Sequence, residues 1–128
     1  MSKYKNQKIS IAGETFDSRK EYLRYVQLSQ QERLGQINNL QRQVRYELVP
    51  PQYEAVPRYS EKTGQRLKDG QKLVEHGVYY VADFVYSLKD GTTVVEDVKG
   101  YREGAAYNIF TIKRKLMLHV HGIRILET

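Results

Sequence analysis

The sequence contains no cysteine and no tryptophan among its 128 residues. Without cysteine, a disulfide framework and a thiolate zinc site are both excluded. The basic start MSKYKNQK is not followed by an apolar stretch, and no run approaches membrane-spanning length. The chain also lacks internal repeats, low-complexity tracts and long blocks of like charge. We therefore expect one soluble domain over residues 1–128 with a single core and a flexible start at residues 1–8.

Positive charge exceeds negative charge across the chain. Lys and Arg number 21 against 15 Asp and Glu, which gives a formal net charge of +6 and a pI near 9.5. A folded surface of this sign attracts polyanions, of which nucleic acid is the most common. Many ordinary domains are equally basic for solubility, so charge alone does not identify the partner. The eleven tyrosines are suited both to core packing and to stacking on bases.

The first helix is predicted to begin at Ser18. Ser18 as N-cap with Glu21 three residues later forms a capping box, and Gly35 suits the position after a last helical residue at Leu34. Glu21 lies at the edge of the apolar stripe, in line with Tyr25 and Leu28, so it need not point into bulk water. The predicted stripe consists of Tyr22, Leu23, Tyr25 and Val26. Before this helix, residues 9–12 predict a short extended piece.

Three strands are predicted after the first helix. Residues 41–49 alternate between apolar and polar side chains, which is typical of a half-buried strand, and Pro50-Pro51 ends it. Residues 53–77 are rich in charge and turn residues, and either an exposed hairpin or a mobile loop fits them. Residues 79–100, YYVADFVYSLKDGTTVVEDVKG, contain two apolar runs joined by Lys89-Asp90-Gly91. We expect this second hairpin to lie at the centre of a covered sheet.

A second helix is predicted over residues 107–119, closed by Gly122 and followed by a strand at residues 123–126. The apolar spacing assigns its inward face to Ile109, Ile112, Leu116 and Val120, flanked by Phe110 and Met117. A right-handed crossover would return the last strand parallel to the second hairpin strand. The predicted fold class is α/β (α+β), with a mixed central sheet of about four strands flanked by helices in the order α-β-β-β-α-β.

Two acids and a lysine occupy the predicted central hairpin. Asp83 lies within its first strand, and Asp97 and Lys99 end its second strand on one face. Mg²⁺ prefers hard oxygen ligands, which Asp83, Asp97 and the Val98 carbonyl would supply, while Lys99 would orient a water and balance charge on phosphate. In the structural alternative, Asp97 and Lys99 form an ion pair and Asp83 bonds to a backbone amide.

The turn of this hairpin decides whether the two acids meet. A three-residue loop at Lys89–Gly91 sets Asp83 opposite Asp97. A two-residue turn would set Asp83 against Val98 and send the acids to different faces. We predict the three-residue loop.

Other charged residues have two interpretations each. Glu21 either caps its helix or joins the metal site, and Lys113 either extends past its apolar neighbours or reaches the same site. Arg114 and Lys115 form a solvated face or contact phosphate. The candidate DNA contacts are Arg102, Lys113, Arg114 and Lys115.

An Asp followed by Asp-x-Lys on the next strand resembles the PD-(D/E)xK nuclease superfamily. The wider tracts FDSRKEYLRYVQL, GQINNLQRQVRYEL, YVADFVY, VVEDVKG and IKRKLM are similar to small phage and prophage proteins catalogued as a domain of unknown function. The similarity extends from about Ile9 to the C-terminus. Ala82 stands where the superfamily name has proline, and the tract 53–77 exceeds the family pattern.

The resemblance implies a restriction-endonuclease-like core and assigns catalytic roles to Glu21, Asp83, Asp97 and Lys99. Asp97 rather than Glu96 takes the second acidic position, because it has the x-Lys spacing. The implied cofactor is Mg²⁺, for which Mn²⁺ substitutes, with no small-molecule cofactor. The implied partner is DNA, cut by a homodimer in the cytoplasm of a bacterial host, with branched DNA such as a Holliday junction as a substrate. The alternative is a non-catalytic DNA-binding accessory protein with the same fold, and a basic scaffold with structural acids is a third reading.

Overall fold

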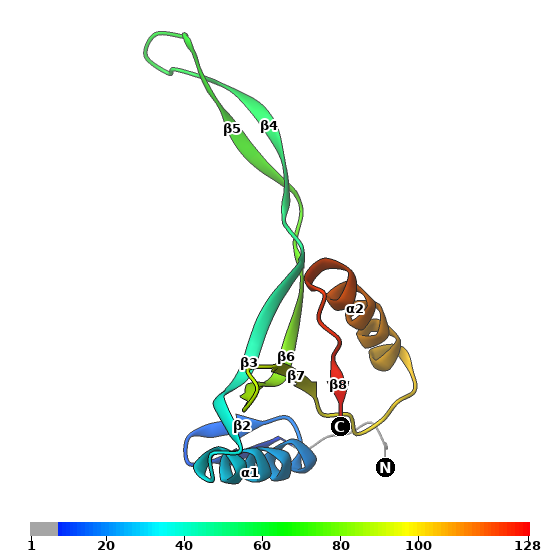
Figure 1. The fold of residues 1–128 in the computed structure, drawn as a ribbon. Helices are drawn as coiled ribbons and strands as arrows, with labels where there is room; N and C mark the ends of the chain where they lie inside the picture. Colours follow the sequence, from blue (N-terminus) through cyan, green and yellow to red (C-terminus); the bar gives the residue numbers. More distant parts are fainter. Residues whose placement is uncertain (1–7) are drawn as a thin grey trace.

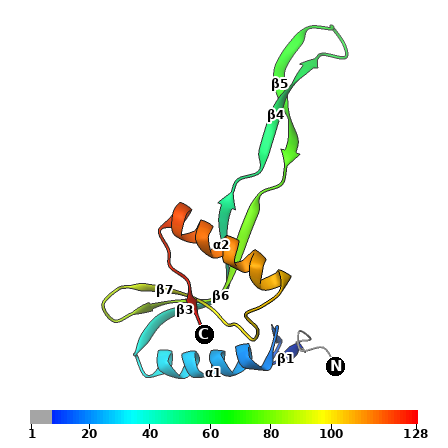
Figure 2. The same ribbon diagram turned by 90° about the vertical axis from the view of Figure 1, so that its right-hand side faces the viewer.

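Two helices pack around a four-stranded mixed sheet, and a two-stranded arm rises away from it (Figures 1 and 2). The computed structural model describes residues 8–128. Its elements are β1 (Ile9–Ile11), β2 (Glu14–Phe16), α1 (Arg19–Arg33), β3 (Ile37–Val49), β4 (Gln52–Tyr59), β5 (Arg66–Glu75), β6 (Val78–Leu88), β7 (Thr93–Asp97), α2 (Ala105–His121) and β8 (Leu126–Glu127). The predicted α+β class with a mixed central sheet is confirmed.

The central sheet has the strand order β3-β6-β7-β8. The β3/β6 and β6/β7 pairs are antiparallel, whereas β7 and β8 are parallel. Helix α2 makes the crossover between these parallel strands, as the strand-helix-strand pattern predicted. The last strand begins at Leu126 rather than at residue 123, so residues 123–125 approach the sheet without pairing in it.

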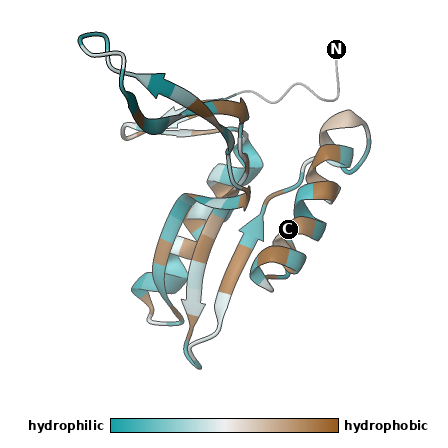
Figure 3. Ribbon diagram, turned by 90° about the horizontal axis from the view of Figure 1, so that it is seen from above, coloured by the Kyte–Doolittle hydropathy of each residue, from teal (hydrophilic) through white to brown (hydrophobic). Residues whose placement is uncertain are grey.

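Each helix covers its own hydrophobic core. One buried cluster lies against α2 and contains Leu48, Tyr80, Ala82, Val85, Val95, Phe110, Met117 and Ile125. The other lies against α1 and contains Leu28, Ile37, Phe84 and Tyr86. Hydrophobic segments accordingly recur on the helices and on the strands between them (Figure 3). Side chains on both faces of β6 and β7 are therefore buried, which explains their nearly continuous apolar runs.

Helix α1 begins as predicted but packs on a different stripe. Ser18 is the N-cap, and its Oγ accepts from the Glu21 backbone N–H at 3.1 Å. The Glu21 carboxylate accepts from the Asp17 N–H at 3.0 Å instead of closing a capping box on Ser18. Leu28 is fully buried, whereas Leu23 and Val26 are exposed, so the predicted stripe is wrong at these two positions. Helix α1 therefore packs against the sheet through the side that carries Glu21 and Leu28.

Helix α2 is longer than predicted and packs through the side adjacent to its predicted inward face, so that of the four residues predicted there Leu116 alone packs against the core. Its C-cap Gly122 has a left-handed φ of 68°, in line with the predicted helix end. Phe110 and Met117 are buried, while Ile109 and Ile112 are exposed by 56% and 58%. The helix carries two apolar stripes, and periodicity alone does not say which of them meets the sheet.

The uncertain segment at residues 53–77 forms a hairpin arm of β4 and β5. It continues outward from β3 and β6 beyond Pro50-Pro51 (Figure 1). Sequence reasoning also missed β2, which pairs with the predicted extended piece at β1. The expectation of a flexible start falls almost wholly outside the described residues. None of the helices within residues 8–128 has the length and apolar character needed to cross a membrane.

Candidate active site

The hairpin turn has the predicted three-residue form. The Leu88 N–H donates to the Thr92 carbonyl at 2.8 Å, and the Gly91 N–H donates to the Leu88 carbonyl at 3.0 Å. Gly91 has a φ of +89°, the left-handed geometry that this turn requires. The resulting ladder pairs Phe84 with Glu96. Continued by one residue, the same register sets Asp83 opposite Asp97.

Asp83 lies where β6 and β7 separate. Its Oδ2 accepts from the Val98 N–H at 2.8 Å, so the carboxylate takes the place of a backbone acceptor at the end of the ladder. At the same point β6 twists: Phe84 faces the α1 core, whereas Ala82 faces the α2 core although both are even-numbered. The twist turns Asp83 toward the gap between the N-terminus of α1 and the end of β7.

Gln43 accommodates the same twist in β3. The ladder pairs Arg42 with Phe84 and Val44 with Ala82, which sets Gln43 opposite Asp83. Gln43 has a φ of +53°, which is unusual for a residue with a side chain and costs of order 1–3 kcal/mol. Its amide Nε2 lies 3.0 Å from Glu21 Oε1 and 3.4 Å from Asp83 Oδ1. The strained backbone of Gln43 thus lies at the point where its side-chain amide donates hydrogen bonds to the Glu21 and Asp83 carboxylates.

Three carboxylates converge at this point. Ligand atoms of Asp17, Glu21 and Asp83 all lie within 4.8 Å of one another. Glu21 is 2% exposed, and Arg42, the one cation paired with it among residues 8–128, is 3.6 Å away from Oε1. Sequence reasoning predicted Glu21 and Asp83 but missed Asp17 and Gln43. Asp17 carries no spacing signal, and strand alternation does not reveal the left-handed backbone of Gln43.

Burial and like charge disfavour ionisation in this group. Burial, followed by the charge of Asp97, raises the pKa of Asp83 to about 7 despite the Val98 hydrogen bond, which lowers it. Burial also raises the pKa of Glu21 above its ordinary value. Glu21 is buried, Asp83 half-buried and Asp17 exposed, and Arg42 is the one cation paired with this group among residues 8–128. A hard divalent ion would stabilise such a set of oxygen donors. The residues present therefore fit Mg²⁺ or Mn²⁺.

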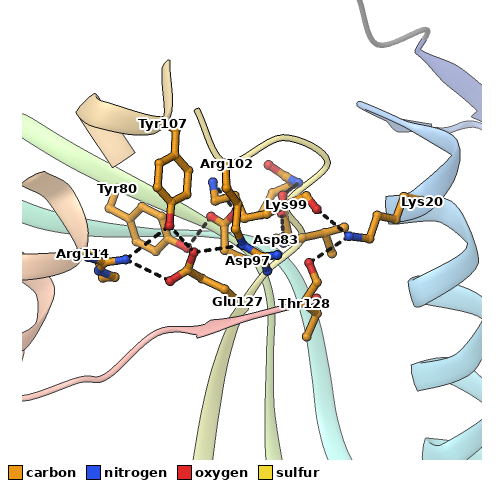
Figure 4. A network of polar contacts seen from close by, with 12 residues as sticks. Lys20, Tyr80, Asp83, Asp97, Lys99, Arg102, Tyr107, Arg114, Glu127 and Thr128 are labelled. Carbon is orange, nitrogen blue, oxygen red and sulfur yellow. Dashed lines mark hydrogen bonds and ion pairs between the residues drawn. The ribbon is translucent and has the colours of Figure 1, made fainter. Parts of the chain in front are cut away.

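Asp97 and Lys99 form a separate pair beside Asp83 (Figure 4). Lys99 Nζ lies 2.7 Å from Asp97 Oδ1, and the Tyr80 hydroxyl donates to Oδ2 at 2.6 Å. The Lys99 ammonium also lies 3.5 Å from the centre of the Phe110 ring, a cation–π contact. Burial and the charge of Asp97 raise the pKa of Tyr80, which keeps its hydroxyl a donor. These contacts fix Lys99 in one position.

The backbone after β7 is tied to both the C-terminus and α1. The Lys99 N–H donates to the Thr128 carbonyl at 2.8 Å, and the Thr128 N–H donates to the Asp97 carbonyl at 2.9 Å. The Lys20 ammonium donates to the carbonyls of Lys99 and Thr128. The segment that carries Asp97 and Lys99 is therefore held on two sides.

A cleft of about 290 Å³ opens next to this pair. Lys113 lines it together with Asp97 and Lys99, so the structure brings this predicted cation to the site. Arg114 Nη1 lies 3.0 Å from Glu127 Oε2. Arg102 Nε lies 3.7 Å from Glu127 Oε1, and Lys115 is exposed on the outer side of α2. Of the four predicted DNA-contacting cations, only Lys113 lines the cleft.

Glu96 belongs to the opposite face of β7. It is fully buried, and Arg24 of α1 binds both of its carboxylate oxygens, with the shortest distance 2.7 Å. Such a matched bidentate pair satisfies the acid within the fold. The structure thus separates the roles of the adjacent acids Glu96 and Asp97.

Comparison with known proteins identifies a family without assigning an activity. No curated protein and no solved structure matches the chain. One family model, described as a protein of unknown function (DUF1064), matches residues 1–124. Because this match covers nearly the whole sequence, the chain belongs to the DUF1064 family.

Proposed function

We propose that this protein is a divalent-metal-dependent endonuclease of the PD-(D/E)xK type that hydrolyses DNA phosphodiester bonds. The observation that carries the proposal is the convergence of the Asp17, Glu21 and Asp83 carboxylates within 4.8 Å, next to the Asp97–Lys99 pair. The net charge of +6 supports an anionic substrate.

Asp83, Asp97, the Val98 carbonyl and Glu21 are the proposed ligands of Mg²⁺, with Mn²⁺ as a substitute. Asp17 adds a carboxylate within reach of Asp83 and Glu21. A bound Mg²⁺ would supply Lewis acidity toward a phosphate oxygen and an attacking water. Hydrolysis by water requires no covalent intermediate on the protein.

Lys99 is the proposed partner of the attacking water and the phosphate. Asp97 and the Phe110 ring hold its ammonium at the cleft, so it can donate to a phosphate oxygen without first becoming ordered. Its positive charge would balance the charge that develops as water adds to phosphorus. Lys113, on the rim of the same cleft, is suited to hold a neighbouring phosphate.

The substrate class follows from the resemblance. Branched DNA, including Holliday junctions in phage recombination or replication, is the proposed target, and the cytoplasm of a bacterial host is the proposed location. A restriction-endonuclease-like core would place the same acids and lysine at the cleavage site.

A second candidate is a DNA-binding accessory protein that does not cleave. One observation favours it: both carboxylate oxygens of Asp97 are already satisfied by Lys99 and Tyr80. In that case Asp97 would be structural and the chain would bind DNA with strong salt dependence.

Cleavage of linear and branched DNAs in Mg²⁺ would decide between these candidates. Asp83→Asn and Lys99→Met should each reduce cleavage by about 10²-fold or more, as removal of a charge-stabilising group does. The turn of the same hairpin provides matched controls, Asp90→Asn and Lys89→Met, which should cleave normally. Mn²⁺ binding, followed by electron paramagnetic resonance, should be lost in Asp83→Asn. Equal cleavage by the site variants and the controls would reject the nuclease assignment.

A further inference from the structure

Helix α2 presents an aliphatic stripe to solvent. Ile109, Ile112 and Val120 are exposed by 56%, 58% and 46%, whereas Leu116, between them along the helix, is partly buried against the core. The spacing of three and four residues places all four side chains on one side. The core instead uses Phe110 and Met117 on the adjacent side. A contiguous aliphatic stripe of this kind marks an interaction surface.

The hairpin arm is also without a covering layer. Within residues 8–128, β4 and β5 make their extensive contacts only with each other, and the arm projects beyond both helices (Figures 1 and 2). Near its base, Tyr53 pairs with Leu73, and Tyr53, Leu73 and Val74 are exposed by 55%, 39% and 54%. An isolated two-stranded hairpin is only marginally stable in water. Apolar side chains on such an arm are expected to be buried against a partner.

The charges on the arm do not match a nucleic acid. The segment 52–75 carries five cationic and four anionic side chains: Arg58, Lys62, Arg66, Lys68 and Lys72 against Glu54, Glu61, Asp69 and Glu75. A ribbon that binds the phosphate backbone would carry an excess of positive charge. Nearly balanced charge with exposed apolar groups instead suits a protein surface.

The charges on α2 also indicate which protein surface complements it. Helix α2 contains Lys113, Arg114 and Lys115 but no acidic residue. Two α2 helices facing each other would therefore place like charges together. The base of the arm carries two acids, Glu54 and Glu75, and one cation, Lys72, opposite Glu54, so its excess of negative charge complements α2.

The dimensions of the arm and α2 agree. The 17 residues of α2 span about 25 Å at 1.5 Å per residue, and the 8 residues of β4 span about 27 Å. With a width of about 12 Å, each surface covers roughly 300 Å². In a two-fold dimer, each protomer buries both its own arm and its own α2 stripe. The buried area is therefore about 600 Å² per protomer, near the lower end of the range for specific interfaces.

We propose that this chain forms a two-fold homodimer in which the arm of each protomer packs on the exposed α2 stripe of its partner. Because Ile109 also lines the cleft beside Asp97 and Lys99, the partner's arm would border that cleft. The inference rests on exposed surfaces and charge and is independent of the nuclease proposal.

Sedimentation velocity from 5 to 100 µM tests the dimer with the full chain. The wild type should sediment as a dimer, while Ile112→Glu and Val74→Glu should each weaken dimerisation at least tenfold. Leu118→Glu, on the other side of α2, and Gln65→Glu, in the turn at the tip of the arm, add a negative charge outside the surfaces and should remain dimeric. Far-ultraviolet circular dichroism checks that each variant is folded. A monomeric wild type, or dimers that resist both substitutions, would overturn the proposal.

The absence of cysteine allows a direct contact test. Val74→Cys and Ile112→Cys proteins are prepared separately, mixed, and treated with a bis-maleimide of about 10 Å span. A cross-linked heterodimer should form between the two variants. Failure of this product to form, or equally efficient cross-linking of Leu118→Cys to Val74→Cys, would contradict the arm-to-α2 contact. If wild type and Val74→Glu are both monomeric and only the variant fails to bind duplex DNA, the arm would instead be a nucleic-acid-binding element.

Discussion

Glu96 and Asp83 are acids on neighbouring central strands that differ in what surrounds their charge. Glu96 faces α1, where Arg24 binds both of its oxygens. Asp83 has no cation within ion-pair distance among residues 8–128, and it lies beside Asp97, Glu21 and Asp17. Burial combined with these like charges raises the pKa of Asp83 to about 7.

The fold neutralises the charge of Glu96 with Arg24, whereas it leaves the charge of Asp83 available to an external cation. A matched bidentate pair satisfies both partners, so Glu96 needs nothing from outside the chain. The group around Asp83 keeps ionisable oxygens together at a cost in stability, which an external cation would remove. Uncompensated buried charge is therefore the structural feature that points to function here.

The largest expected effect is the loss of folding stability when Arg24, the cation that pairs with Glu96, is removed. Arg24→Met should destabilise the fold by about 3–5 kcal/mol, because it leaves Glu96 buried and unpaired. Urea unfolding measures the change. The exposed pair Arg66–Asp69 provides the control, since Arg66→Met should cost less than about 1 kcal/mol. Similar small losses for both variants would show that Glu96 is not stabilised by its partner.

Binding of Mn²⁺ should stabilise the uncompensated group. At one hundred times the dissociation constant, the free energy of unfolding should rise by about 2.7 kcal/mol. The gain should fade below pH 7, because protonated Asp83 is a poor ligand. Thermal unfolding at pH 8 and pH 5.5, with and without Mn²⁺, measures this. Equal stabilisation of Asp83→Asn at pH 8 would place the ion elsewhere.

Removal of the uncompensated charge should stabilise the metal-free protein. The folded pKa of Asp83 near 7 exceeds the ordinary value of about 3.9, so the folded state binds the extra proton between these pH values. Wild-type stability should therefore fall as the pH rises from about 4 to 7. Asp83→Asn avoids this loss and should be more stable by about 1–3 kcal/mol at pH 8 and equal at pH 4.

Chemical unfolding in EDTA across this pH range measures the difference. Asp90→Asn is the control on the same hairpin, because hydrogen bonding by the Thr92 backbone lowers the pKa of Asp90. That variant should be slightly less stable than wild type at neutral pH, the opposite sign. A pH-independent effect of Asp83→Asn would exclude the charge as its cause.

The smallest expected effect concerns the strained backbone of Gln43. Gln43→Ala loses the amide contacts and keeps the left-handed strain, whereas Gln43→Gly loses the contacts and relieves the strain. The glycine variant should be more stable than the alanine variant by about 1 kcal/mol in urea unfolding. Asn39, with a φ of 55° outside the acidic group, is the matched control for strain alone. Only the Gln43 variants should also weaken Mn²⁺ binding, since only Gln43 contacts Glu21 and Asp83.

Local rules predicted the parts of the site that short segments determine. The three-residue turn followed from the position of Gly91, and the ladder that it sets, with Phe84 paired to Glu96, is the one that this turn predicts. The helix start at Ser18 was equally readable, because capping depends on adjacent residues. Asp17 contacts Glu21 locally, but it meets Asp83 only through the packing of α1 against the twisted strands, and Gln43 meets both acids only in this way.

The sequence alone determined the acid-acid-lysine set, the hairpin that carries it and the mixed α+β class, because turns, caps and alternation are local. The tertiary structure decided which face of α2 is buried, since two apolar stripes of similar strength compete on that helix. It also decided that Arg24 neutralises Glu96 while Asp83 stays uncompensated. That assignment depends on where α1 docks, and docking depends on contacts across 72 residues of chain.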